Sequence, residues 1–260
     1  MVVGLFRESA MEVILPDFVA MEIMERMAEA SPRFKARLAG VSQLLEGLTF
    51  TFGQVIVLRK LVVSGNAAAT AANILSNEHL FRFGFASCVV GVGFHIAWAL
   101  LFYDLFKPVN RRLSLLAAFV ILVGCAVQAV TSVLYLSPLL VLGGGSAVSA
   151  LTAEQLQALA YVLLRLNGIA FDVYLVFFGL WCVLIGYLIF RSTFLPRILG
   201  VLLAIDGLGW MMYLSPPLAN SLFLFIAVAA GLAEFPLELW LLMFGVNEQR
   251  WREQARAAGQ

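Results

Sequence analysis

The side chains with the clearest chemical potential in this chain are ionisable groups that lie inside long apolar stretches. They are Glu46, His95, Asp206, Glu234 and Glu238. An ionisable group in hydrocarbon is costly, and it is found where it has a partner, a water-filled cavity or a function. These residues are therefore the candidate site for binding a ligand or carrying a proton.

The composition predicts an integral membrane protein. Of 260 residues, 62% are hydrophobic and 13% are charged, and the mean hydropathy is +0.94. Soluble domains carry about 25% charged residues, so lipid must solvate much of this chain, and the bilayer is its expected partner. The net charge of +1 argues against a nucleic-acid partner, which needs a basic patch. Cys88, Cys125 and Cys182 all lie in apolar runs, which favours buried thiols over disulfides or zinc ligands.

Several segments are long and apolar enough to cross a membrane, which takes about 20 residues. The predicted spans are residues 38–58, 83–106, 113–136, 168–190, 197–214 and 218–245. The fourth span could begin earlier, because residues 153–166 already have a helical pattern after Thr152. Pro216 and Pro217 should end the fifth span and create a tight hairpin with the sixth. The predicted fold class is all-α, an integral membrane six-helix bundle.

Lysine and arginine in the loops predict the orientation, because they concentrate on the cytoplasmic side. One side would hold Arg33, Lys35, Arg37, Lys107, Arg111, Arg112, Arg191, Arg197, Arg250, Arg252 and Arg256, and the other Arg59, Lys60 and Arg82. Both termini are therefore predicted to be cytoplasmic (N-in, C-in).

The bundle is expected to have a segment before it and a tail after it. The predicted regions are an N-terminal amphipathic or docking segment at residues 1–35, the six-span bundle at 36–247 and a cytoplasmic tail at 248–260. Asp17 could cap an amphipathic helix with Phe18 and Met21 on one face and Glu22 and Glu25 on the other. Anionic lipid attracts basic side chains, so this acidic helix is expected to dock on a membrane-protein partner or lie on the surface.

Two connections have distinct patterns. Residues 65–81 predict a small helix near the membrane surface, whereas residues 137–150 predict a flexible loop with three consecutive glycines at 143–145. A glycine loop that cradles phosphate joins a strand to a helix, and no strand is expected here.

Three stretches carry a resemblance to a known family. They are GNAAATAANIL at 65–75, KPVNR at 107–111 and FFGLWCVLIGYLIFRSTFLPRILG at 177–200. Over about residues 36–247 the chain resembles the bacterial multi-pass membrane proteins catalogued as domain of unknown function 4386. The resemblance implies a bacterial inner-membrane protein and no particular activity. The family pattern has a histidine where Trp181 stands, often another near Asn167, and commonly a glutamate at the position of Glu234.

The positions of the ionisable residues within their spans predict that these residues lie at similar depths in the membrane. At about 1.5 Å of rise per residue, Glu46, His95, Asp206 and Glu234 all fall near the bilayer centre. Glu238 lies one turn from Glu234 on the same helical face. Pro236, between these two glutamates, is expected to kink the helix and free a backbone carbonyl as a further oxygen ligand.

The set supports two readings. If the side chains converge, they could carry protons or bind a cation. Histidine with carboxylates also suits zinc, iron or manganese, but no metal-ligand spacing such as HExxH is present, so no metal site is assigned and any cofactor is unknown. Alternatively, each side chain is neutral or hydrogen-bonded to a neighbouring helix. Polar residues Gln43, Gln128, Thr131 and Ser132, with Gly179 and Gly186, are interpreted as contacts between helices.

Arg165 and Asp172 form a second candidate group near the outer interface. They lie on one helical face, separated by two turns or about 10 Å, which is too far for a direct ion pair. With Asn167 and Tyr174 they could line an outer vestibule, or Arg165 could extend to the headgroups.

Three functions fit these observations. The first is a small transporter, or a bundle that binds an ion or small ligand through its mid-membrane carboxylates. The second is an accessory or scaffold subunit of a larger membrane complex, docked through the N-terminal helix. The third is an intramembrane, metal-assisted enzyme, although no nucleophile constellation supports it.

Overall fold

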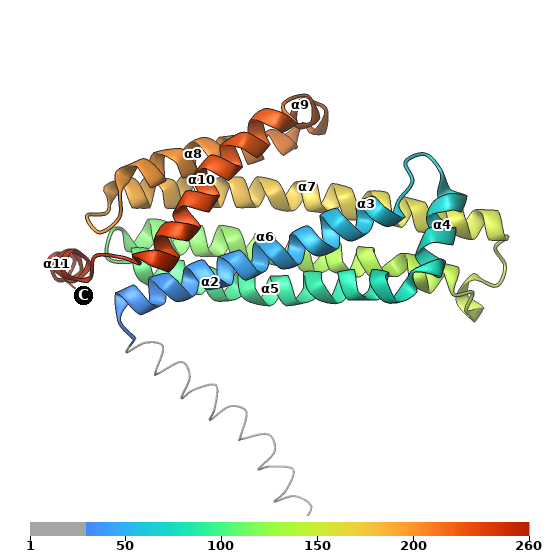
Figure 1. The fold of residues 1–260 in the computed structure, drawn as a ribbon, viewed down its shortest axis with the longest axis horizontal. Coiled ribbons are helices and arrows are strands. Elements are labelled where there is room, and N and C mark those ends of the chain that lie inside the picture. The colour runs from blue at the N-terminus through green and yellow to red at the C-terminus, as the bar shows by residue number, and fades with distance from the viewer. Residues whose placement is uncertain (1–29, 260) are drawn as a thin grey trace, which may run out of the picture.

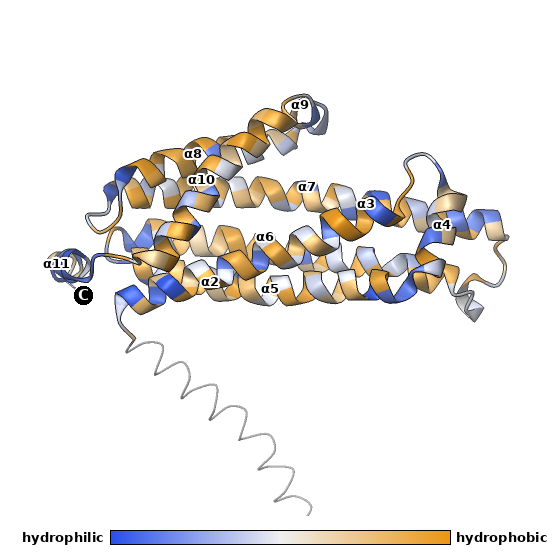
Figure 2. Ribbon diagram, in the orientation of Figure 1, coloured by the Kyte–Doolittle hydropathy of each residue, from blue (hydrophilic) through white to orange (hydrophobic). Residues whose placement is uncertain are grey.

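The computed structural model describes residues 30–259, and this part of the chain is built from helices with no strand (Figure 1). Its candidate membrane-spanning helices are Pro32–Leu61, Glu78–Phe106, Arg111–Leu142, Ala153–Arg191, Arg197–Leu214 and Phe223–Met243. Figure 2 shows apolar residues along their middles and the most hydrophilic residues toward their ends. The prediction of six apolar helices in an all-α bundle is confirmed. The predicted helix that begins near Asp17 lies outside the described residues.

The first span is continuous but changes its hydrogen-bond pattern halfway. It consists of α2 (Pro32–Phe50), a π-helical segment (Thr51–Val57) and α3 (Leu58–Leu61). π-helical turns leave backbone carbonyls without their usual partner and occur often at functional sites. Here, side chains from other helices take over: Ser87 donates to the Thr49 carbonyl, and the Tyr135 hydroxyl donates to the Gly53 carbonyl at 3.2 Å.

The short helix α4 (Ala67–Ser76) covers one end of the bundle before α5 (Glu78–Phe106) begins (Figure 1). Asn66 caps α4 by accepting a hydrogen bond from the Ala69 amide, and the Asn73 side chain donates to the Leu61 carbonyl. The Gly65 amide donates to the Tyr161 hydroxyl of α7 at 2.8 Å. The predicted small helix is therefore present, and we refer to this part of the bundle as the α4 end.

Helix α6 (Arg111–Leu142) is longer than the sequence predicts. The predicted span ended at residue 136, but the helix continues through Pro138 for one more turn. Leu139 and Val141 are buried in that turn, and their packing offsets the hydrogen bond that proline cannot donate. The prediction of a flexible loop at 137–150 is therefore wrong for residues 137–142, and a single 3-10 turn (Ser146–Val148) follows.

Helix α7 (Ala153–Arg191) has 39 residues, which corresponds to about 58 Å. It begins with a capping box between Thr152 and Gln155. The fourth span therefore starts directly after Thr152, the earlier of the two predicted positions, and not at residue 168. A hydrocarbon core is about 30 Å thick. Helix α7 is therefore longer than the hydrocarbon core, and α4 packs against it.

The last part of the chain forms a shorter hairpin. It comprises α8 (Arg197–Met211), a 3-10 turn (Met212–Leu214), α9 (Pro216–Ser221), α10 (Phe223–Met243) and the terminal helix α11 (Glu248–Ala257). The predicted last span, 218–245, is therefore wrong at its start, because the non-helical backbone of Leu222 separates α9 from α10. The segment predicted as a cytoplasmic tail, residues 248–260, contains the helix α11.

Helix α8 packs on α7 through facing glycines. A methyl group added at Gly186 would lie 2.6 Å from the Gly200 carbonyl, and one added at Gly207 would lie 2.5 Å from the Gly179 carbonyl. These distances leave no room for a side chain, so the two backbones touch. The interpretation of Gly179 and Gly186 as helix contacts is confirmed.

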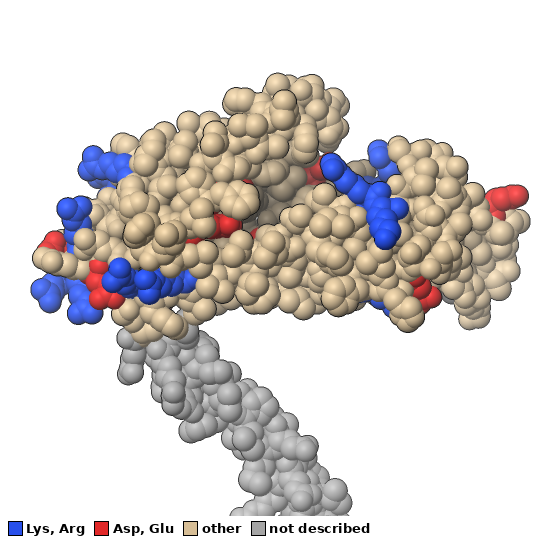
Figure 3. Space-filling model, in the orientation of Figure 1, with Lys and Arg blue, Asp and Glu red and all other residues tan. Residues whose placement is uncertain are grey.

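The opposite end of the bundle, which we call the α11 end, is fastened by basic and aromatic side chains. Arg33 and Arg37 of α2 donate to the Phe244 and Met243 carbonyls at the end of α10, at 3.1 and 3.0 Å. The Trp251 indole of α11 donates to the Leu105 carbonyl at 2.9 Å. Lysine and arginine gather at this end in Figure 3.

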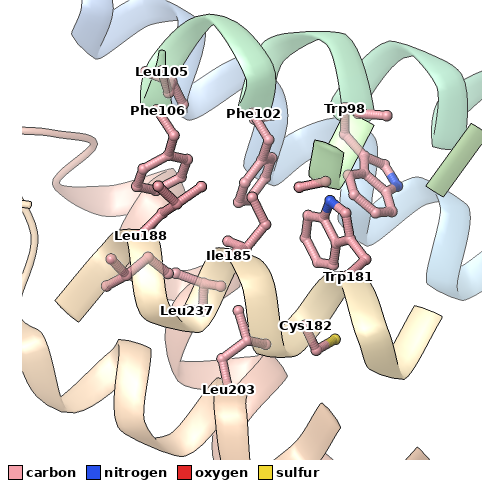
Figure 4. Close-up of a cluster of buried hydrophobic side chains, with 14 of the residues drawn as sticks. Trp98, Phe102, Leu105, Phe106, Trp181, Cys182, Ile185, Leu188, Leu203 and Leu237 are labelled. Atoms are coloured by element: carbon pink, nitrogen blue, oxygen red, sulfur yellow. The ribbon is translucent and has the colours of Figure 1, made fainter. Parts of the chain in front are cut away.

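The larger hydrophobic core lies between α5 and α7 and extends to α8 and α10 (Figure 4). Trp98 of α5 meets Trp181 of α7 edge to face, with ring centroids 4.5 Å apart, and Phe102 lies 5.2 Å from Trp181. Leu203 and Leu237 bring α8 and α10 to the same cluster. This core fixes the helices whose polar residues are described next.

Candidate functional site

Three buried polar side chains from α2, α5 and α6 form one hydrogen-bonded group. The Gln128 carbonyl oxygen lies 2.8 Å from His95 Nδ1, and the Gln128 amide donates to Glu46 Oε1 at 3.3 Å. Glu46 Oε1 is also 3.2 Å from His95 Nδ1. Because both neighbours of Nδ1 are acceptors, this nitrogen must carry a hydrogen. We call Glu46, His95 and Gln128 the bonded group.

The imidazole of His95 is held on both sides by aromatic rings. It stacks on Trp98 at 4.3 Å and meets Tyr174 edge-on at 5.7 Å. His95 is 0% exposed, and its Nε2 atom has no hydrogen-bond partner among the described residues. Because Nδ1 carries the hydrogen, Nε2 is the ring nitrogen that keeps a free lone pair in the neutral imidazole.

A second polar group comes from α8 and α10. The Trp210 indole donates to Glu234 Oε1 at 3.0 Å. Asp206 is 0% exposed, and neither of its carboxyl oxygens has a hydrogen bond of normal geometry within the described chain, although Glu234, Trp210 and Cys182 are its neighbours. The glycine contact at Gly207 draws this part of α8 against α7. We call Asp206, Trp210 and Glu234 the open group.

The two groups share one band of the bundle. Glu238, which is 9% exposed, interacts electrostatically with Glu46 of the bonded group and with Glu234 of the open group. Tyr174 interacts with both Glu46 and Glu234. The structure therefore brings together the five ionisable residues that the sequence singled out, as two groups joined by Glu238 and Tyr174.

Helices α2 and α10 separate beside this band. A methyl group at Gly40 would lie 3.1 Å from the Leu241 side chain, whereas one at Gly47 would meet nothing within 4 Å. These glycines lie two turns apart on one face of α2, so α10 leaves α2 between them. Gly47 directly follows Glu46. Figure 3 shows the corresponding face hollowed in its middle, with acidic atoms beside the hollow.

Arg165 and Asp172 lie toward the α4 end of α7, apart from the two groups. Arg165 is exposed and Asp172 is half-buried; they interact electrostatically, but within residues 30–259 no direct ion pair joins them. Asp172 neighbours Tyr213 of the 3-10 turn after α8. Asn167, expected beside them, is buried and donates to the Thr131 carbonyl at 2.8 Å, so it fastens α7 to α6 instead.

The sequence does not identify the hydrogen-bond partners of two members of these groups. Gln128 is a contact between helices, as the sequence predicts, but its partners are the candidate residues Glu46 and His95. Trp210 is not among the candidate residues of the sequence, yet its indole donates to Glu234. Gln128 carried a signal, because an amide inside an apolar span needs a partner. Trp210 carried none that separates it from the other tryptophans.

In the part of the chain that the structure describes, no three His, Cys, Asp or Glu side chains are grouped so that they could hold a metal ion. Trp181, where the family pattern has a histidine, is 1% exposed and packs on Trp98, the ring that stacks on His95. An indole thus fills that position in this chain (Figure 4).

Comparison with known proteins agrees with this architecture. The family described as Domain of unknown function (DUF4386) matches residues 38–245. No curated protein matches the chain, and no solved structure does. The six apolar helices are those of a multi-pass membrane protein. The chain belongs to the family described as Domain of unknown function (DUF4386).

Proposed function

We propose that the protein is a small transporter-like bundle that binds a cation among its mid-membrane carboxylates. This cation is either a proton or another small positively charged ligand. The observation that carries the proposal is the electrostatic chain of four carboxyl groups, Asp206, Glu234, Glu238 and Glu46, with His95 beside Glu46 at one end of it. Along the chain, no lysine or arginine lies within eight residues of any of these five positions. Several carboxylates without a cationic side chain are expensive in hydrocarbon, so protons or a bound cation must balance them.

The two groups suggest different roles. The bonded group holds the His95 ring and the Glu46 carboxylate in fixed positions, which suits proton exchange at Nε2. The open group leaves both Asp206 oxygens without a hydrogen bond of normal geometry within the described chain, and such atoms are available to a ligand. The separation of α10 from α2 beside Gly47 supports access from the side of the bundle.

The concentration of basic residues at the α11 end supports an orientation. By the positive-inside rule, this end would face the cytoplasm and place both termini there. The family resemblance supports the bacterial inner membrane as the location. The α4 end, with Arg165 and Asp172, would then form the outer vestibule of the same site.

Ligand-dependent unfolding of the full chain in neutral detergent tests the proposal. The cations to compare are sodium, ammonium and tetramethylammonium at constant ionic strength. A cation that binds the native state should stabilise it by about 2.7 kcal/mol at one hundred times its Kd. Proton flux into pH-jumped proteoliposomes tests the proton itself.

Glu234→Gln should abolish the cation-dependent stabilisation and the flux. Glu78→Gln is the matched control, because Glu78 is exposed and pairs with Arg82 on α5. If no cation stabilises the protein and the flux is the same in the wild type and in Glu234→Gln, the proposal is wrong.

A scaffold role is the second candidate, and one observation favours it. The Gln128–Glu46 and Trp210–Glu234 hydrogen bonds each join two helices, so the same carboxylates could serve only to hold the bundle together. The expected docking element for a membrane-protein partner is the N-terminal segment, residues 1–35. Under this alternative, Glu234→Gln changes the unfolding midpoint, and cations do not stabilise either the wild type or the variant.

A further inference from the structure

A cavity of about 700 Å³ lies at the α11 end, away from the mid-membrane carboxylates. It is bounded by the segment between α7 and α8, the first turn of α8 and one face of α11. Its polar lining includes Ser192, Thr193, Arg197, Arg250, Glu253 and Gln254. The proposed cation site does not involve any of these residues.

Hydrogen bonds fix the walls of this cavity. The Thr193 amide and hydroxyl both donate to Gln254 Oε1, at 3.1 and 3.0 Å, and Arg250 donates to the Thr193 carbonyl at 3.3 Å. The Gln254 oxygen is therefore occupied, which leaves its amide group as a donor. Glu253, the acidic member of the lining, accepts a hydrogen bond from Gln249 at 3.0 Å. The donors that remain in the lining are the Gln254 amide and the guanidinium groups of Arg197 and Arg250.

Two arginines face this cavity from different helices. Arg250 comes from α11, and Arg197 comes from the first turn of α8 with its guanidinium 5.7 Å from the centre of the Phe190 ring. Pro196 precedes α8 and gives its first turn no side-chain cap. Two guanidinium groups that line one cavity from different helices match a phosphate group, which accepts several charge-assisted hydrogen bonds.

An exposed apolar surface begins where the cavity ends. Phe190 of α7 and Ile198 and Val201 of α8 are 45%, 60% and 38% exposed. These residues continue from the α11 end toward the middle of the spans. A ligand held by its phosphate at Arg197 could therefore lay hydrocarbon along α8, which a free phosphate would not use.

We propose that this cavity binds the phosphate headgroup of an anionic phospholipid, whose acyl chains pack on the exposed face of α7 and α8. Basic pockets at the ends of membrane helices bind such headgroups. The bound lipid would join α11 to the start of α8 through Arg250 and Arg197.

The test uses the full chain purified in neutral detergent, with phosphatidylglycerol, phosphatidylcholine and inorganic phosphate as separate probes. Retained lipid is counted by native mass spectrometry, and the unfolding midpoint is measured with each probe. Wild type should retain phosphatidylglycerol and be stabilised by it, but not by phosphatidylcholine or by inorganic phosphate at equal concentration.

The variants separate the cavity from general surface charge. Arg197→Gln should weaken phosphatidylglycerol binding about 5-fold, and the double variant Arg197→Gln with Arg250→Gln about 30-fold, at about 1 kcal/mol per arginine. Arg252→Gln removes the same charge from α11 outside the cavity lining and should leave binding unchanged. Arg250 also bonds to Thr193, so the double variant removes a contact that holds α11. The single Arg197 variant keeps this contact, and a loss of lipid binding in it therefore does not reflect undocking of α11.

Three results would overturn the proposal. One is equal phosphatidylglycerol binding in Arg197→Gln and Arg252→Gln. Another is equal retention of phosphatidylcholine by the wild type. The third is stabilisation by inorganic phosphate as strong as that by the lipid, which would assign the cavity to a soluble phosphate ligand.

Discussion

Glu46 and His95 lie on α2 and α5, where Gln128 bonds to both of them. Asp206 and Glu234 lie on α8 and α10, where one indole bonds to Glu234 and nothing of normal geometry bonds to Asp206 within the described chain. Both groups are at similar depth in the bundle. They differ because α5 and α6 are long neighbouring helices, whereas α10 packs mainly on α8 and, near Gly40, on α2.

The difference indicates which part of the site is fixed and which can respond to a ligand. A buried polar atom without a partner is costly, so a protein keeps one mainly where something else binds. In the bonded group, Gln128 bonds to both Glu46 and His95, and the buried His95 Nε2 is left without a partner among the described residues. In the open group, both Asp206 oxygens lack a hydrogen bond of normal geometry within the described chain, and the group lies on the hairpin that separates from α2.

The largest expected effect comes from the glycine contact that holds α8, and with it Asp206, against α7. Gly186→Ala should destabilise the protein by about 3 kcal/mol, because the new methyl group meets backbone atoms that cannot move independently. Unfolding in detergent measures the change. Gly231→Ala on α10 is the control, since a methyl group there meets nothing within 4 Å; it should be neutral or stabilising by up to about 1 kcal/mol.

Equal destabilisation by the two alanines would contradict the close backbone contact between α7 and α8. It would also remove the reason for treating Asp206 as held in place by the hairpin.

Much of the fold follows from the sequence, because hydropathy reports directly which segments lipid can solvate. The spans were placed from apolar length, and the depth of Glu46 and Asp206 followed from helical rise. The ends of the helices are harder to predict. Helix α6 continues through Pro138 because Leu139 and Val141 are buried by packing, and no local sequence signal shows their partners.

The pairing within the site could not be predicted for a physical reason. Depth along a span does not give the rotation of the helix about its axis, and only that rotation decides whether Gln128 faces His95 or lipid. The separation of α10 from α2 beyond Gly40 is likewise a property of how whole helices cross. The sequence supplied the list of costly residues, and tertiary packing sorted them into two groups.

Removing the bridging amide should show that the bonded group contributes more to stability than the open group. Gln128→Leu should cost about 2 kcal/mol, because Glu46 and His95 both lose a buried partner. Trp210→Phe deletes only the donor to Glu234 and should cost about 1 kcal/mol or less. Thermal or denaturant unfolding of both variants, in the same detergent, measures the order. The reverse order would mean that the hairpin, not α5 and α6, anchors the polar band.

Neutralising Asp206 should separate stability from ligand response. Asp206→Asn changes a buried acid whose oxygens have no hydrogen bond of normal geometry within the described chain, so the unfolding free energy should change by less than about 1 kcal/mol, while cation-dependent stabilisation is lost. Asp104→Asn is the matched control: Asp104 pairs with Lys35 and Lys107 at 2.9 and 2.8 Å. It should cost about 1 kcal/mol and leave the cation response intact. A retained cation response in Asp206→Asn would exclude the open group as the binding site.

The smallest effect on stability, and the sharpest test of access, is expected at Gly47. A leucine there enters open space beside Glu46, so the unfolding free energy should shift by less than about 1 kcal/mol. The side chain should nevertheless block the approach between α2 and α10. A hydrophobic carbodiimide, which adds to protonated carboxyl groups in membranes, should then modify Glu234 and Glu238 more slowly than in the wild type, as followed by mass spectrometry of peptides. Gly93→Leu on α5 also enters open space and should leave the labelling rate unchanged. Unchanged labelling in Gly47→Leu would show that the reagent reaches the carboxylates by another route. The gap between α2 and α10 would then not be what makes the open group more accessible than the bonded group.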